Sequence, residues 1–130
     1  MKPLIGLAAA VAVAGAACGA PSATGPQGDR VFRQQCFSCH ALEQGESTPA
    51  GPTLHAVVGR PIAADQGFNY SPALRRLAAR HGRWTPELLD RFLADPEAVA
   101  PGTQMGLPGL DDAAARRALI DWLGRPREPR

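Results

Sequence analysis

The sequence contains few of the residues that usually fill a small core or form a charged binding face. Aromatic residues make up only 5% of its 130 residues, and a single tyrosine is present. Lysine occurs once, at Lys2, so that nearly all basic residues are arginines, and the formal net charge is only +2. This balance argues against an extended basic face for nucleic acid. So few aromatics leave the core short of apolar surface, which a bound apolar cofactor would supply.

The chain also lacks an apolar run long enough to predict a membrane span. Its most apolar segment, 4–17, follows Lys2 and precedes small residues around Cys18, a pattern typical of an export signal. We therefore expect residues 1–20 to be a signal segment, with the bacterial periplasm as the destination. Cys18 leaves two alternatives: it resembles a lipoprotein processing site, which would tether the protein to a membrane, or it is removed with the signal peptide.

The rest of the chain has the length of one domain. Residues 21–27 are rich in Pro, Ser, Thr and Gly and predict a flexible linker, whereas the Pro-Arg tail at 125–130 is expected to be disordered. Between them, residues 28–124 show apolar spacing and capping residues typical of an all-α domain. Helices are expected over residues 28–36, 72–81, 86–95 and 113–123.

The motif Cys36-Phe37-Ser38-Cys39-His40 carries the clearest chemistry. On a helical turn, residues three apart share a face, so both thiols can meet the two vinyl groups of one porphyrin. The histidine that follows can bind the iron as its proximal ligand. A structural disulfide and a zinc site are the alternatives, although zinc wants four ligands. A thioredoxin-like pair would need a βαβ context that the neighbouring sequence does not offer.

Met105 is a second candidate ligand. It lies in a segment, 100–109, that has neither a helical nor a strand period and is rich in Gly and Pro. Such a methionine could simply fill a gap in the packing. With a haem motif in the same chain, an axial thioether explains it better.

These segments together resemble the class I c-type cytochromes of the mitochondrial and bacterial long-chain type. The resemblance implies a cytochrome c fold, in which short helices surround one covalently bound haem c and the first and last helices pack crosswise. It rests on the haem motif and on three further segments: Gly51-Pro52-Thr53-Leu54-His55 with Gly59-Arg60, Gly67-Phe68-Asn69-Tyr70, and Pro101-Gly102-Thr103-Gln104-Met105.

The same resemblance implies the parts of the site. The thiols of Cys36 and Cys39 would attach the haem, and His40 and Met105 would be the axial iron ligands. Five further residues would support the haem pocket. Pro52 would accept a hydrogen bond from His40, and Arg60, Tyr70 and Trp84 would surround a haem propionate. Leu107 would stand in the haem pocket where the family commonly has a phenylalanine.

With both axial positions filled by protein, the resemblance implies an electron carrier of a respiratory or photosynthetic chain and not an enzyme. Its partners would be redox proteins, such as a membrane oxidoreductase complex or a terminal oxidase, and the chain would act as a monomer. The alternative is a haem peroxidase or a haem-based sensor with a labile Met105. Because the processed chain would contain no lysine, we expect its docking contacts to be more apolar and less salt-sensitive than those of lysine-rich family members.

Overall fold

The computed structural model describes residues 24–106 and 108–127, and this part of the chain is helical. It contains no β-strand, only an isolated bridge between Pro61 and Arg83, so the all-α prediction is confirmed. None of its helices is long and apolar enough to cross a membrane. The expected signal segment with Cys18, and Leu107, lie outside the described residues. The helices are α1 (Thr24–Gln35), α2 (Pro72–His81), α3 (Pro86–Ala94), α4 (Pro96–Val99) and α5 (Ala113–Leu123).

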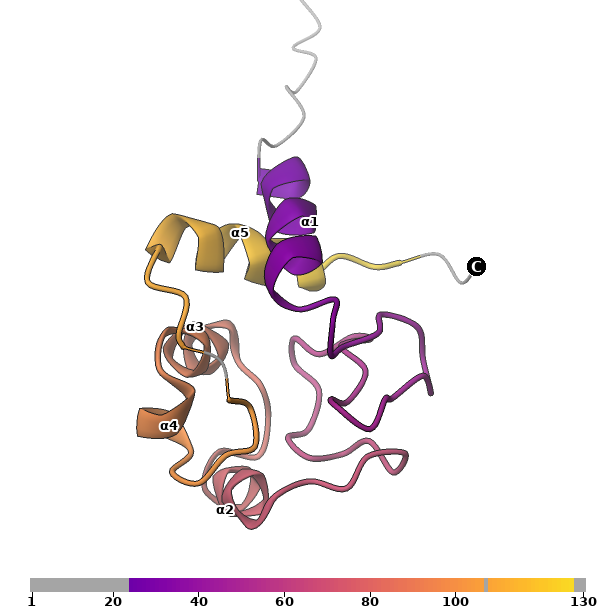
Figure 1. Ribbon diagram of the computed structural model, residues 1–130, viewed down its shortest axis with the longest axis vertical. Helices are drawn as coiled ribbons and strands as arrows, with labels where there is room; N and C mark the ends of the chain where they lie inside the picture. The colour runs from indigo at the N-terminus through magenta and orange to yellow at the C-terminus, as the bar shows by residue number, and fades with distance from the viewer. Residues whose placement is uncertain (1–23, 107, 128–130) are drawn as a thin grey trace, which may run out of the picture.

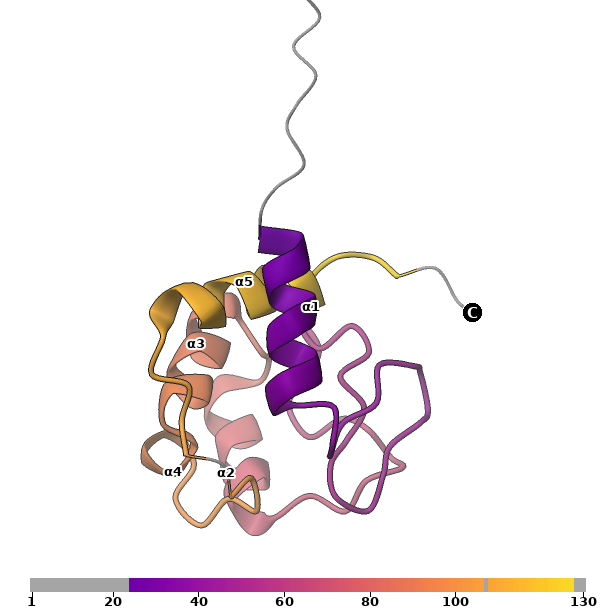
Figure 2. The same cartoon turned by 45° about the horizontal axis from the view of Figure 1, so that its top comes forward.

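The first and last helices cross, as Figures 1 and 2 both show. At the crossing, Gly28 lies so close to α5 that an added Cβ would sit 2.3 Å from Cβ of Trp122 and 2.4 Å from the carbonyl oxygen of Ala118. One turn further along α1, the ring of Phe32 packs against Trp122 with centroids 5.4 Å apart. The crosswise packing of these two helices is therefore confirmed.

Helices α2 and α3 begin where their sequences predicted. The hydroxyl of Ser71 accepts the N–H of Leu74 at 3.3 Å, and the hydroxyl of Thr85 accepts that of Leu88 at 3.1 Å. Each cap is followed by a proline, whose missing N–H costs nothing in the first helical turn. These caps fix the directions in which both helices leave the loops that precede them.

The two ends of the domain are more structured than the sequence suggested. Helix α1 begins at Thr24, so residues 24–27 are helical and not part of a flexible linker. Pro26 is tolerated there because it lies in the first turn. At the other end, the guanidinium of Arg127 stacks on the ring of Trp122 at 3.9 Å and donates to its carbonyl at 3.1 Å. This cation–π contact holds residues 125–127 against α5, where a disordered tail was expected.

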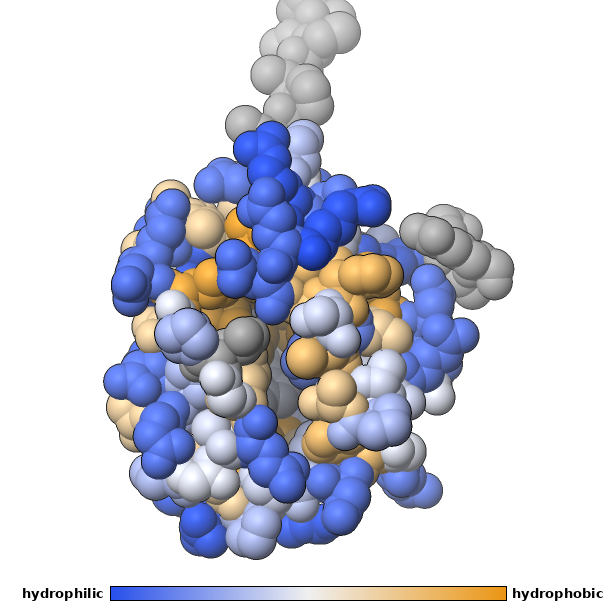
Figure 3. Space-filling model, in the orientation of Figure 1, coloured by the Kyte–Doolittle hydropathy of each residue, from blue (hydrophilic) through white to orange (hydrophobic). Residues whose placement is uncertain are grey.

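The remaining elements form two sides beneath the α1–α5 crossing. Helices α3 and α4 lie on one side, residues 36–71 form non-helical loops on the other, and α2 lies at the far end from the crossing (Figure 1). The most deeply buried large side chains are Leu77 of α2 and Leu119 of α5. Figure 3 shows that the face seen in this view is hollowed between the two sides.

Candidate functional site

The haem motif begins directly after α1, where the chain continues as a hydrogen-bonded turn. The N–H of Cys36 donates to the carbonyl of Phe32 at 2.9 Å, and those of Cys39 and His40 both donate to the carbonyl of Cys36 at 3.0 Å. This turn fixes the spacing of the two cysteines, which are free thiols. Burial is the main reason that the pKa of Cys36 rises to about 11, with the thiol of Cys39 adding to it.

The imidazole of His40 is oriented by the loop that passes beneath it. Its Nδ1 atom lies 2.7 Å from the carbonyl oxygen of Pro52. A carbonyl only accepts hydrogen bonds, so Nδ1 carries the proton and Nε2 keeps a free lone pair. Burial lowers the pKa of His40, with the Pro52 hydrogen bond acting in the opposite direction. The neutral ring is therefore the form present near pH 7, and it is the form that binds a metal.

Gly51 allows the ring to take this place. A Cβ at residue 51 would lie 2.7 Å from Cε1 and 2.8 Å from Nδ1 of His40. Any side chain there would collide with the imidazole. Sequence reasoning did not give Gly51 a role, although its position immediately before Pro52 is a signal that could have indicated one.

Arg60 is the cation of the site, and its side chain is half-buried. Its two terminal nitrogens donate to the carbonyls of His55 at 2.7 Å and Thr53 at 2.9 Å. Its Nε is buried and, within the described part of the chain, has no hydrogen-bond partner. A buried donor without a partner costs free energy, and an anionic group beside Nε would remove that cost.

Trp84 and Tyr70 lie near Arg60. The backbone N–H of Trp84 donates to the carbonyl of Arg60 at 2.9 Å, and the backbone carbonyl of Trp84 accepts the N–H of Gly59 at 2.7 Å. Both aromatic side chains are buried. Burial raises the pKa of Tyr70, while the positive charge of Arg60 acts against it, which places the phenol within the field of that guanidinium. Three of the expected propionate-side residues are thus brought together.

Met105 lies in the loop that follows α4. Its side chain is partly buried and shares a small cavity with Cys36, lined also by the apolar side chains of Leu93, Pro96 and Leu110. The structure therefore brings the thioether near the first cysteine of the haem motif. His55 lines a different cavity of about 340 Å³ beside the C-terminal residues.

These residues fit a haem with two carboxylate arms. Two free thiols can form thioethers, one imidazole nitrogen and one thioether sulfur are available as ligands, and the unpartnered Nε of Arg60 can receive a carboxylate. The zinc alternative has no comparable ligand set, because no group of three His, Cys, Asp or Glu side chains suited to a metal ion occurs between residues 24 and 127, residue 107 aside.

Comparison with known proteins points to one family. Cytochrome c-type cyt cy of Rhodobacter capsulatus is 40% identical over 96 residues, which are 74% of this chain and 46% of that protein. Cytochrome c type-1 of Ascaris suum is 38% identical over 75% of this chain and 88% of its own length. The structure of cytochrome cH from Methylobacterium extorquens matches with a TM-score of 0.67 and 32% identity, covering 76% of this chain and 95% of that one. No protein-family model matches the chain.

The helical fold, the hollow and these relatives define the class of protein. The chain belongs to the class I c-type cytochromes. Members of this family carry one covalently bound haem c with its iron, and this chain is a monohaem electron carrier. It spans just under half the length of the Rhodobacter relative.

Proposed function

We propose that the haem is attached through Cys36 and Cys39 and that His40 and Met105 are the axial ligands of its iron. The observation that carries this proposal is the hydrogen bond from His40 to Pro52. It fixes the ring tautomer with Nε2 free, which is the arrangement that a ligating histidine needs. The small cavity that Met105 shares with Cys36 supports the second ligand.

When bound, the haem iron supplies a one-electron couple, and a His/Met pair favours a higher reduction potential than two histidines do. The chain's own residues then set the environment of that couple. Arg60 would place a half-buried positive charge near the propionate side, and the buried side chains of Trp84 and Tyr70 would shield the same side from water. With two protein ligands no coordination position is left for a substrate, which favours electron transfer over a peroxidase or sensor role.

The optical spectrum of the oxidised, haem-loaded protein tests the ligands. We expect a weak long-wavelength band that reports sulfur bound to ferric haem, and we expect Met105→Ala to abolish it. A parent protein that is high-spin, or whose spectrum shows two histidines bound, would reject Met105 as the ligand and favour the peroxidase or sensor alternative. His55→Ala in the same background would then identify a competing histidine.

We further propose a place in a respiratory or photosynthetic chain, with a membrane oxidoreductase complex or a terminal oxidase as partner and the chain acting as a monomer. Phe37 supports an apolar contact near the attachment site, because it adjoins Cys36 and its side chain is 68% exposed. Phe37→Ser should slow electron transfer to such a partner, and added salt should slow it little. A steep fall in rate with salt would reject the apolar contact.

The location of the protein follows from how its first 20 residues are processed. We propose export to the bacterial periplasm, either as a free protein or tethered by a lipid on Cys18. Cys18→Ser separates these alternatives: it should release the protein from membranes only if Cys18 is lipidated. Mass measurement of the mature N-terminus would distinguish lipidation from signal-peptide removal, and a full-length unprocessed chain would reject export.

A further inference from the structure

We propose that Glu97 is a positioning residue for Met105, acting through the turn between α4 and the methionine; the proposal rests on Met105 being the axial ligand. Helix α4 is a single turn, begun by Asp95, whose Oδ1 accepts the N–H of Ala98 at 3.0 Å. The sequence predicted only that Pro96 ends the preceding helix. Instead, Asp95 closes α3 and opens α4, which brings the Glu97 side chain over the turn that follows.

The carboxylate of Glu97 holds the amide of Gly102. Both carboxylate oxygens accept this one N–H, at 3.0 Å and 3.1 Å. Gly102 has a φ of 83°, in the left-handed region that favours glycine. A glycine at such a position has the widest backbone freedom of any residue, so an external hydrogen bond is the most direct way to restrict it.

From Gly102 the hydrogen bonds continue to the methionine. The next amide, that of Thr103, donates to the carbonyl of Ala100 at 2.9 Å, and the Thr103 hydroxyl accepts the N–H of Met105 at 3.4 Å. Ala100 itself is only 1% exposed, so this end of the turn is anchored in the core. An unbroken series of contacts therefore joins Glu97 to the backbone of Met105.

Two arginines of α2 hold the same turn from its carbonyl side. Nη2 of Arg76 donates to the carbonyl of Pro101 at 3.4 Å, and Nη2 of Arg80 donates to that of Val99 at 3.3 Å. These two bonds link α2 to a loop whose residues follow the arginines by 25 and 19 positions in the chain. The turn is held by a carboxylate on its amide and by guanidiniums on its carbonyls, and of these three side chains Glu97 holds the residue nearest in sequence to Met105, Gly102.

Replacing Glu97 by alanine tests this role in the haem-loaded protein. Two quantities are measured. The first is the midpoint pH at which the sulfur-to-iron band is half lost as the pH is raised, and the second is the hydrogen-exchange rate of the Gly102 amide. We expect Glu97→Ala to shift the balance toward released methionine roughly ten-fold, lowering that pH by about one unit, and to speed Gly102 exchange by a similar factor. Glu97→Gln keeps an acceptor oxygen and should recover most of both effects.

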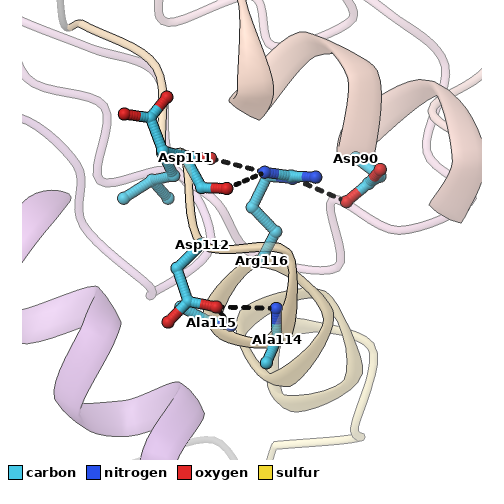
Figure 4. A network of polar contacts seen from close by, with 7 residues as sticks. Asp90, Asp111, Asp112, Ala114, Ala115 and Arg116 are labelled. Atoms are coloured by element: carbon cyan, nitrogen blue, oxygen red, sulfur yellow. Dashed lines mark hydrogen bonds and ion pairs between the residues drawn. The ribbon is translucent and has the colours of Figure 1, made fainter.

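Asp112→Ala provides the matched control. Asp112 is also an exposed carboxylate on a backbone cap, where its Oδ1 accepts the amides of Ala114 at 2.8 Å and Ala115 at 3.1 Å (Figure 4). It should lower overall stability without moving either readout. If Glu97→Ala merely matches Asp112→Ala, or if Glu97→Gln is as impaired as Glu97→Ala, the positioning role is overturned. A parent protein without the band would instead reject the Met105 ligand itself, and the positioning role with it.

Discussion

His40 and Pro52 are joined by a hydrogen bond of 2.7 Å from the ring Nδ1 to the backbone carbonyl. A backbone acceptor leaves the charge of the site unchanged, whereas a carboxylate in its place would add a negative charge next to the ring. The carbonyl also cannot rotate away as a side chain can. The orientation of the imidazole therefore depends on the path of the loop at residues 51–53.

Gly51→Ala should displace this ring. The added Cβ would lie 2.7 Å from Cε1 of His40, so either the imidazole or the loop must move. We expect about 1–3 kcal/mol of destabilisation in denaturant titration, as overpacking usually costs, and a larger high-spin fraction in the optical spectrum. Gly124→Ala is the control, since its added Cβ would make only ordinary contacts at 3.4 Å or more. Equal spectra for the two variants would contradict the prediction.

Arg60 should influence the reduction potential and the stability by separate routes. The half-buried positive charge of Arg60 favours the reduced iron. Because Arg60→Gln removes that charge, we expect the potential to fall by on the order of 50–100 mV, roughly 1–2 kcal/mol for one electron. Arg60→Lys keeps the charge but cannot reach both carbonyls that the guanidinium now holds. It should recover much of the potential, measured by redox titration, but little of the stability. A potential unchanged in Arg60→Gln would place the guanidinium outside the field of the haem.

Asp65 should make the free energy of unfolding depend on pH in the acidic range. Its carboxylate accepts the hydroxyl of Ser47 and, at 2.9 Å, the N–H of Gly67. These bonds, the Ser47 bond first, hold the pKa of Asp65 below its ordinary value of 3.8. The unfolded chain therefore takes up a proton first as the pH falls. The stabilisation is complete above the ordinary pKa and is lost as the pH falls through the lower folded value.

Asp65→Asn should accordingly destabilise the protein at pH 7 by about 1 kcal/mol, a typical loss for one such hydrogen bond, and by less at pH 3. Urea titrations of the haem-loaded protein at several pH values measure this. Asp121→Asn, at an exposed residue of α5, is the control. A deficit that stays the same down to pH 3 would show that the carboxylate charge is not the cause.

Sequence reasoning anticipated the elements whose signals are local. Ser71 and Thr85 predict the starts of helices, because a capping residue and the proline after it act on the backbone within a few residues. The crossing of α1 and α5 was expected from the family resemblance, and the two helices approach closely at Gly28 and Trp122. The residues of the haem motif are adjacent in the chain, so their chemistry could be recognised before any fold was known.

Contacts between distant segments were not predictable in the same way. That Arg60 would hold the carbonyls of Thr53 and His55 depends on a loop path that no local pattern specifies. The single-turn helix α4 was missed because Pro96 predicts the end of one helix as readily as the start of another. At the C-terminus, composition indicated disorder, yet the stacking of Arg127 on Trp122 depends on where α5 presents its ring.

The crossing of α1 and α5 offers the sharpest test of the fold. Gly28→Ala would place a methyl group 2.3 Å from Cβ of Trp122, and this contact involves the base of a side chain and the backbone carbonyl of Ala118, neither of which can swing aside. The helices must separate, which also loosens the packing of Phe32 on Trp122. We expect a loss of roughly 3 kcal/mol in urea titration, at the upper end for overpacking, although alanine is the better helix former. The sulfur-to-iron band should survive in the protein that remains folded, because the crossing lies apart from the loop that carries Met105. If the band were instead lost in proportion to the loss of stability, the crossing would be part of the ligand site.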